Sequence, residues 1–423
     1  MSSIRRLLPS RRAMAASDAV VERIVAKYLR PGVINLAPGT AHWSAELHSE
    51  LMPPLADAAS FPRWSRYGAV HGSEALLSAL REKLETENGH DMAAGTREVM
   101  VTNGANQAYA AALLATCDPG DEVVLFRPYY FSHLVAVQLL GLVPRVIDCD
   151  ALGQPDVAAL RCVLASSPHI RAVTLVSPSN PSGICCNTRT RQELLSACQG
   201  AGAWLISDEA YEHFVYGGEP HVSPAAASTT PSDAADDSVI SLYTFSKSFG
   251  LAGWRVGYMS YPIQLHDPLL KVQDTLPTHA TLYSQELARR ALTQLGTPWV
   301  RHHVASLGLA RSQLWTKVQP LHQHRELEVA ATLRDGGGAT EALTPPVQPA
   351  GAFYYMLPLP NGLDEERAIA VLAQQHGLLV LPGSAFGAPG SLRLSYGLLA
   401  DAVEVDEAAT RLAAGVQSLL HST

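Results

Sequence analysis

From about residue 98 onward, short runs of β-forming residues alternate with segments that have helical hydrophobic spacing. This alternation is typical of a parallel sheet flanked by helices, because parallel neighbours need a long crossover that is usually a helix. We therefore expect an α/β unit. Its predicted strands are 98–102, 122–126, 144–149, 173–177, 204–207, 240–245 and 256–260, and its predicted helices are 105–115, 131–140, 156–166 and 188–200.

The pattern changes in the last third of the chain, where helices and strands no longer alternate evenly. This indicates a smaller α+β unit. We predict an N-terminal arm over 1–50 that joins the small unit, a large domain over 51–290 and a small C-terminal domain over 291–423. The predicted elements are long helices around 262–320, strands at 352–357, 378–381 and 392–395, a closing helix from 401, and loops at Pro224–Asp237 and Gly336–Gly338.

Composition and charge exclude several classes of protein. The 423 residues are 47% hydrophobic and 17% charged, which is typical of a soluble protein with a large core. The net charge of −8 offers no basic excess for nucleic acid or anionic membranes, so we expect neither as a partner. No run reaches roughly 18 consecutive apolar residues, and the six cysteines lack zinc-site spacing, so no metal is expected. We expect a cytoplasmic location, with a weak organellar transit segment as the alternative because of Arg5, Arg6, Arg11 and Arg12.

The segment Thr244–Tyr258 (TFSKSFGLAGWRVGY) places a single lysine directly after a predicted buried strand. The hydroxyls of Thr244 and Ser246 flank Lys247, and Arg255 follows eight residues after the lysine. Lysine forms Schiff bases best where burial or a neighbouring cation lowers its pKa, and hydroxyls with a guanidinium suit a phosphate. The pattern indicates a carbonyl-reactive amine beside an anion site. An ordinary surface lysine among structural glycines is the alternative.

Three more motifs fall at predicted strand ends, where open α/β sheets bind their ligands. SDEAYEHF places Asp208 at the end of one strand and Tyr211 three residues later, and SPSNPSG places Asn180 after another. In TNGANQ a strand leads into a helix, so the backbone amides of Ala105 and Asn106 form a potential anion site. Taken singly, each motif also fits a plain turn or a helix cap; together at one sheet edge they indicate a binding site.

With these motifs in place, the chain resembles the class I/II aminotransferases, pyridoxal-5'-phosphate enzymes of fold type I, from about Ile34 to Leu420. The resemblance implies a large domain with a mostly parallel seven-stranded sheet, a smaller α+β C-terminal domain, and a homodimer with shared active sites. It implies that Lys247 forms the Schiff base with the cofactor and that Asp208 pairs with the protonated pyridine nitrogen. Asn180 and Tyr211 would hold the phenolic oxygen of the cofactor ring.

The resemblance extends to further cofactor and substrate contacts, residue by residue. Tyr130 in PYYF would stack on the cofactor ring, with a core aromatic as the alternative, and Tyr67 would reach the phosphate of the neighbouring subunit. Arg393 in SLRLSYG would bind the substrate α-carboxylate; the alternative is an arginine on a surface strand that has no part in binding. The implied phosphate contacts are Gly104, Ala105, Asn106, Thr244, Ser246 and Arg255, and the implied substrate contacts are Gly39, His42, Trp43, Asn180 and Arg393, where His42 and Trp43 could equally be packing residues.

A narrower resemblance concerns the substrate. INLAPGTAHW, MVTNGANQAY, FRPYYFSH and LLKVQDTLP look like a plant-type branch that transaminates methionine and aromatic amino acids with pyruvate or phenylpyruvate by a ping-pong mechanism. A dicarboxylate substrate needs a second cation for its distal carboxylate. Between Trp254 and Leu287 the basic side chains are only Arg255, which is assigned to the phosphate, Lys271, His266 and His279, and this favours neutral donors over aspartate unless a cation comes from elsewhere in the dimer. The alternatives are an aspartate-type aminotransferase, a carbon–sulfur lyase or aminocyclopropane-type synthase on the same scaffold, and a cofactor-sensing regulatory domain.

Overall fold

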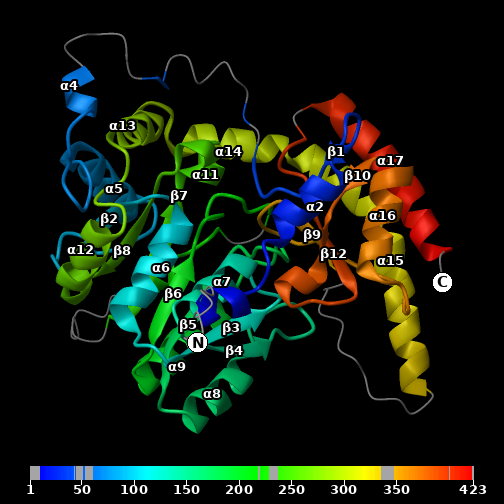
Figure 1. Ribbon diagram of the computed structural model, residues 1–423, viewed down its shortest axis with the longest axis horizontal. Coiled ribbons are helices and arrows are strands. Elements are labelled where there is room, and N and C mark those ends of the chain that lie inside the picture. The colour runs from blue at the N-terminus through cyan, green and yellow to red at the C-terminus, as the bar shows by residue number, and fades with distance from the viewer. Residues whose placement is uncertain are drawn as a thin grey trace, which may run out of the picture.

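A seven-stranded sheet forms the centre of the larger part of the protein (Figure 1). The computed structural model describes residues 10–41, 43, 51–52, 61–217, 220–227, 237–334, 347–399 and 401–421. At 330–334 it describes only the backbone. The strand order is β2-β8-β7-β6-β5-β3-β4; β8 is antiparallel to both of its neighbours, and every other pair is parallel. The mostly parallel sheet expected for fold type I is therefore confirmed. Its strands are β2 (Arg97–Thr102), β3 (Glu122–Arg127), β4 (Val143–Asp148), β5 (Ile170–Val176), β6 (Trp204–Asp208), β7 (Val239–Thr244) and β8 (Gly257–Pro262).

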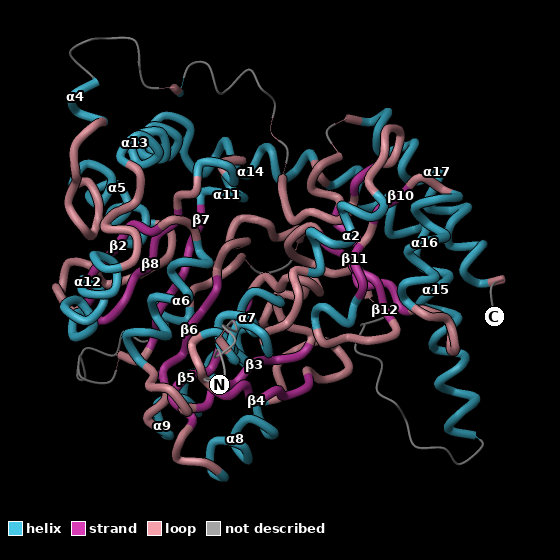
Figure 2. Tube along the Cα trace, in the orientation of Figure 1, coloured by secondary structure: helices cyan, strands magenta, loops and turns pink. Residues whose placement is uncertain are grey.

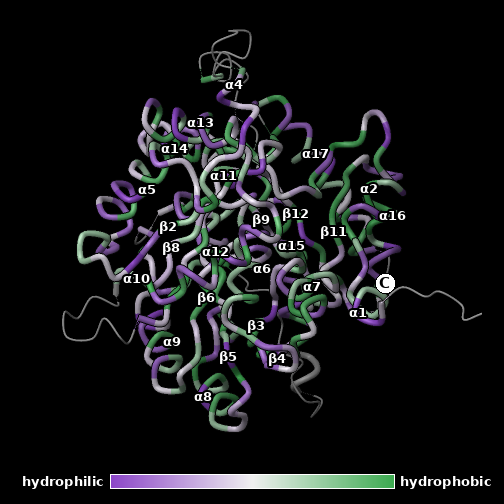
Figure 3. The backbone as a smooth tube through the Cα atoms, turned by 60° about the vertical axis from the view of Figure 1, so that its left-hand side comes forward, coloured by the Kyte–Doolittle hydropathy of each residue, from purple (hydrophilic) through white to green (hydrophobic). Residues whose placement is uncertain are grey.

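Helices cover both faces of this sheet (Figure 2). The alternation of side chains along a strand explains why both faces must be covered. In β3, Val123 and Leu125 belong to one buried cluster, whereas Val124 and Phe126 belong to another. The first cluster lies under α6 (Ala105–Thr116), α7 (Phe131–Leu139) and α12 (His266–Thr275), and the second lies under α8 (Val157–Ser166), α9 (Thr188–Ala201) and α10 (Pro224–Ala227). Helix α7, with the sequence FSHLVAVQL, is largely hydrophobic in Figure 3.

A smaller antiparallel sheet, in the order β11-β12-β9, lies beside the large one. It consists of β9 (Tyr354–Pro358), β11 (Leu381–Pro382) and β12 (Ser391–Ser395). Helices α15 (Gly308–Arg334) and α16 (Glu365–Gln375) pack against it, and α17 (Ala402–Leu420) packs on these two helices. The N-terminal arm joins this part through a parallel pair of β1 (Ile34–Asn35) and β10 (Leu378–Leu379). Further helices are α1 (Arg11–Ala15), α2 (Val20–Tyr28), α4 (Phe61–Trp64), α5 (Glu74–Thr86), α13 (Leu282–Arg290), a π-helical stretch at Ala291–Leu295, and α14 (Gly296–Ser306). Within the described ranges, no helix combines the length and apolar character that a bilayer crossing requires.

Two sequence expectations need correction. The single strand expected at 378–381 is two short strands, because the chain changes partner there: β10 pairs with β1, and β11 pairs with β12. The expected loop at Pro224–Asp237 begins with α10, whose alanines favour a helix and whose Ala225 is buried in the core. Gly336–Gly338 lies outside the described residues, and the domain limits at 50 and 290 stay a prediction.

Candidate active site

A cavity of about 410 Å³ opens at the carboxyl ends of the central strands of the large sheet. This is the edge at which open α/β sheets bind ligands, because the loops there converge from several strands. Residues from β12 and from the N-terminal arm close the cavity from the side of the small sheet. Twelve of the site residues proposed from the sequence line this one cavity: Gly39, Ala105, Asn106, Tyr130, Asn180, Asp208, Tyr211, Thr244, Ser246, Lys247, Arg255 and Arg393.

Lys247 projects into the cavity from α11 (Phe245–Ser248), the short helix that directly follows β7. Thr244 caps this helix, since its side-chain oxygen accepts a hydrogen bond from the Ser246 amide at 3.1 Å. The Nζ atom of Lys247 donates to the carbonyl oxygen of Gly39. Burial, reinforced by the charges of Arg393 and Arg255 and opposed by Asp208, lowers the pKa of the lysine to about 8. About a tenth of the amine is therefore neutral and nucleophilic at pH 7, far more than for a lysine with the ordinary pKa of about 10.4.

Asp208, at the end of β6, is held by a histidine that the sequence analysis missed. The Nε2 atom of His133 lies 3.1 Å from Oδ2 of Asp208, and both side chains are buried. The His133 ring packs against Tyr109 with ring centroids 4.0 Å apart, and the Tyr109 hydroxyl is 2.8 Å from the Thr174 hydroxyl. The Ala210 amide donates to Oδ1 of Asp208 at 3.1 Å. The carboxylate is thus fixed in one orientation toward the cavity.

A buried ion pair anchors the turn that follows Asp208. The Nζ atom of Lys83, on α5, lies 2.6 Å from Glu212, and the Asn88 amide donates to the same carboxylate at 2.7 Å. Burial alone would raise the pKa of Glu212, but Lys83 and His213 more than offset it and lower the pKa to about 2. Because Glu212 is one residue from Tyr211, this pair fixes the turn that presents Asp208 and Tyr211 to the cavity.

Glu209, in the same turn, is completely buried and is also fully partnered. One carboxylate oxygen accepts a hydrogen bond from the Ser223 hydroxyl at 2.9 Å, and the other lies 2.8 Å from Nε2 of His221. The Tyr243 hydroxyl donates at 3.2 Å to the same Glu209 oxygen that lies near His221. Since a buried carboxylate needs such partners, this network fixes the turn from the side opposite the cavity.

Two tyrosines and a glycine pack tightly on one side of the amine. The hydroxyl groups of Tyr211 and Tyr354 are hydrogen-bonded to each other, and burial holds the pKa of Tyr211 well above its usual range. A Cβ atom at Gly39 would collide with the Tyr354 hydroxyl, so only glycine fits there. Tyr211 therefore remains a neutral hydroxyl that can donate a hydrogen bond to a ligand.

The opposite end of the cavity is built to hold an anion. Helix α6 begins at Ala105 with its free backbone amides, and the hydroxyls of Thr244 and Ser246 line the same cavity. Arg255 adopts a left-handed backbone conformation (φ 51°), and its guanidinium donates to the carbonyls of Ala252 at 2.9 Å and Asn103 at 3.1 Å. Gly104, at φ 83°, leaves room for this guanidinium: a Cβ atom there would lie 2.6 Å from Nη2 of Arg255.

Arg393 comes from β12 of the small sheet and is only 2% exposed. Its Nη1 atom donates to Oδ1 of Asn180 at 3.1 Å, and Nη2 donates to the carbonyl oxygen of Ala37. The guanidinium also lies over the rings of Tyr354 and Phe386, at 4.6 and 4.8 Å. In the described part of the chain no carboxylate pairs with it, and its Nε atom has no partner. A buried cation without a counterion is an unusual and costly feature, which a carboxylate ligand would relieve.

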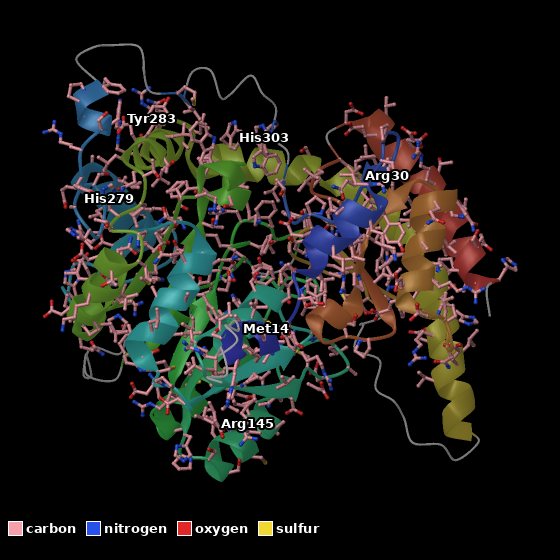
Figure 4. All side chains as sticks on the ribbon, viewed as in Figure 1. Met14, Arg30, Arg145, His279, Tyr283 and His303 are labelled. Carbon is pink, nitrogen blue, oxygen red and sulfur yellow. The ribbon has the colours of Figure 1, made fainter. Side chains whose placement is uncertain are left out.

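Three of the residues proposed from the sequence do not line the cavity, and a fourth cannot be placed. Gly104 lies just behind Arg255, and Trp43 is buried outside the cavity, where it packs against Phe214. Tyr67 is 83% exposed and contacts the His279 ring edge-to-face, with centroids 6.0 Å apart, on the side of the molecule where Figure 4 labels His279 and Tyr283. His42 lies outside the described residues.

The structure also adds residues to the cavity that the sequence analysis had not proposed for the site. Helix α2 contributes Val20, Val21 and Glu22, and Phe131 follows Tyr130 at the start of α7. Their hydrophobic spacing alone would assign the two valines to a packed helix face. They reach the site only because the N-terminal arm folds across it, which no local pattern reveals.

A buried reactive lysine, a fixed carboxylate and an anion cradle on this sheet define a pyridoxal-phosphate-dependent enzyme of fold type I. Comparison with known proteins agrees: residues 32–412 match the family model "Aminotransferase class I and II". The chain belongs to this family and is a pyridoxal-phosphate-dependent aminotransferase.

Relatives across most of the chain include two curated enzymes and many solved structures. "Aromatic aminotransferase ISS1" of Arabidopsis thaliana is 34% identical and aligns over 97% of both chains. An aspartate aminotransferase of Rhizobium meliloti is 30% identical over 84% of this chain and 82% of its own. A structure of a Thermus thermophilus aspartate aminotransferase tetra mutant with tryptophan has a TM-score of 0.80 and 27% identity, covering 97% of this chain and 100% of its own.

The residues present fit pyridoxal phosphate. The amine of Lys247 can condense with an aldehyde, Asp208 offers a buried carboxylate to a cationic ring nitrogen, and the cradle around Arg255 offers donors to a phosphate. Each charged or polar group of the cofactor thus has a complementary partner in the same cavity.

Proposed function

We propose that this aminotransferase moves the amino group of an aromatic or methionine-like L-amino acid to a 2-oxo acid such as pyruvate or phenylpyruvate. The supporting observation is the charge of the cavity. Among its described lining residues the cations are Lys247, Arg255 and Arg393. In this proposal Lys247 and Arg255 serve the cofactor, and Arg393 serves the substrate α-carboxylate. No described cation remains for a distal carboxylate, whereas Val20, Val21 and Phe131 offer an apolar surface.

In this proposal the substrate is oriented by its carboxylate. Arg393, with its planar fork of donors, binds the α-carboxylate together with Asn180 and the backbone at Gly39. This places the α-carbon of the substrate toward Lys247, whose neutral amine would accept the α-proton at Nζ and pass it to the carbon that the cofactor supplies as its aldehyde. A positioned proton-transfer group of this kind contributes about 10² to 10⁴ in rate.

The cofactor, when bound, supplies the aldehyde carbon and the electron sink of the reaction. Asp208, held by His133, would pair with the ring nitrogen, Tyr211 and Asn180 would donate to the phenolic oxygen, and Tyr130 would pack on the ring. Thr244, Ser246, Arg255 and the amides of Ala105 and Asn106 would hold the phosphate. These assignments rest on the common cavity that the residues line and on the family resemblance.

We also propose that the enzyme is a homodimer whose subunits complete each other's sites. Tyr67 supports this, because its hydroxyl belongs to a side chain that is 83% exposed and lies outside the cavity of its own subunit. Sedimentation of the purified holoenzyme at twice the 45.2 kDa chain mass is the expected result.

The test of substrate class is a panel of amino acids mixed with the holoenzyme while the cofactor absorbance is followed. Phenylalanine, tyrosine and methionine should bleach the cofactor at least about tenfold more efficiently than aspartate, the difference that ~1.4 kcal/mol of transition-state stabilisation makes. A preference for aspartate would instead support an aspartate-type enzyme, the second candidate, which the name of the Rhizobium relative favours. Release of ammonia with pyruvate would identify a lyase.

A further inference from the structure

Two residues of the N-terminal arm, Gly39 and Trp43, contact Lys247, one at its side chain and the other at its backbone. The side-chain amine donates to the carbonyl of Gly39, and the backbone carbonyl accepts a hydrogen bond of 2.9 Å from Nε1 of Trp43. The same segment accepts a hydrogen bond from Arg393 at the carbonyl of Ala37. One short piece of chain therefore touches the reactive amine, its backbone and the carboxylate-binding arginine.

The backbone carbonyl of Lys247 lies at the end of a helix of only four residues. In a longer helix the amide of Leu251 would donate to this carbonyl, but here it donates to the carbonyl of Phe245 at 3.2 Å. The indole N–H of Trp43 takes the place of that missing donor. Without it, a partly buried carbonyl next to the reactive side chain would lose its donor.

The indole is held in a single position by its surroundings. Trp43 is buried and stacks on Phe214 with ring centroids 6.2 Å apart. The rings of Trp299 and His303, on α14, meet it edge-on at 6.1 and 5.5 Å, and Figure 4 labels His303 on this helix. Gly250, in the left-handed region at φ 66°, lets the loop after Lys247 approach, since a Cβ atom there would lie 2.7 Å from the indole. The direction of the N–H is thus fixed by packing.

We propose that Trp43 is a positioning residue: its N–H fixes the backbone of Lys247 and thereby the path along which the amine moves the substrate α-proton. The inference rests on the proposed proton-carrying role of Lys247. It assigns Trp43 a function away from the substrate side chain and predicts that the N–H group, and not the aromatic ring alone, is required.

The test compares Trp43→Phe with Trp299→Phe, a neighbour in the same aromatic cluster that has no hydrogen bond to the lysine in the described structure. Both holoenzymes are mixed with phenylalanine and with α-deuterated phenylalanine, and bleaching is followed by stopped flow. For Trp43→Phe we expect a rate about tenfold lower and a larger deuterium isotope effect, because proton transfer becomes more strongly rate-limiting. Trp299→Phe should stay within about twofold of the unaltered enzyme in both readouts.

The proposal is overturned if Trp43→Phe matches Trp299→Phe in rate and isotope effect. Should Trp43→Phe fail to form holoenzyme, the benzothiophene analogue of tryptophan at position 43 replaces the N–H with sulfur and keeps both rings; an unchanged isotope effect there overturns it as well. Failure of the proposed function has a different signature, since the unaltered holoenzyme would then not be bleached by phenylalanine.

Discussion

Replacing Arg393 with methionine separates the binding of a ligand from the stability of the fold. The side chain is 2% exposed, and its hydrogen bonds go to the neutral oxygens of Asn180 and Ala37. No described carboxylate neutralises it, and burial lowers its pKa. The buried charge of Arg393 therefore destabilises the free enzyme and contributes favourably only when an anion binds to it.

The size of the effect follows from this environment. Removing one partner of a buried, hydrogen-bonded charge pair costs about 2–5 kcal/mol, which is roughly 30-fold to several thousand-fold in kcat/KM. We expect a value near the lower end, because Asn180 and water can still contact the carboxylate of the substrate. Stability should change little, since removal of an unneutralised charge offsets the two lost hydrogen bonds to within ~2 kcal/mol.

The assay measures kcat/KM for half-reactions with phenylalanine, methionine, alanine and aspartate, alongside thermal unfolding of the same holoenzyme. Every amino acid should lose activity by a similar factor, because all share the α-carboxylate, and Arg393→Lys should recover part of it. A loss of activity with only one amino acid would mean that Arg393 contacts the side chain of the substrate and not its α-carboxylate. A large fall in unfolding temperature would mean that the arginine is a structural residue, and either result refutes the reasoning.

Three further predictions follow from the other buried charges. Lys247→Ala should retain the cofactor through its phosphate contacts but slow the half-reaction at least ~100-fold, as measured by bleaching; near-normal turnover would contradict the assignment. Because the pKa of Lys247 is about 8, reconstitution of the apoenzyme with pyridoxal phosphate should accelerate from pH 7 to 9 and then level off, whereas an ordinary lysine would keep accelerating toward pH 11. Lys83→Met should destabilise the protein by ~3–5 kcal/mol in thermal unfolding by leaving Glu212 buried without its cation, and adding Glu212→Leu should restore most of this; a neutral single variant would refute the role of the pair.

Features that depend on local order along the chain could be predicted from the sequence. The strands and helices of the large sheet lie within three residues of their expected ends, because the hydrophobic period and the turn residues are local signals. The same holds for the positions of Asp208, Asn180 and Lys247, since each lies at the end of a strand or within four residues after it, and parallel strands end at one edge. The exception is 378–381, where one strand was expected and two are found. The strand that a segment pairs with depends on residues far away in the chain, so the change of partner between β10 and β11 could not be predicted from the local sequence.

The supporting residues of the site could not be predicted, because their roles arise from contacts across the fold. From the local sequence, His133 looks like a polar residue in the mostly apolar helix α7. In the structure it orients the carboxylate of Asp208, which lies 75 positions later in the chain. Lys83 reads as a charge on an amphipathic helix, yet its partner Glu212 fixes the turn that bears Tyr211. The family resemblance implied that Trp43 lies near the substrate, with packing as the alternative; in the structure it packs outside the cavity, and its N–H points to the lysine backbone. The residues that line the cavity could be predicted because they lie at strand ends. The residues that position them, such as His133 and Lys83, are recognised only from contacts in the folded structure. Each kind must therefore be substituted separately to assign its role in the reaction.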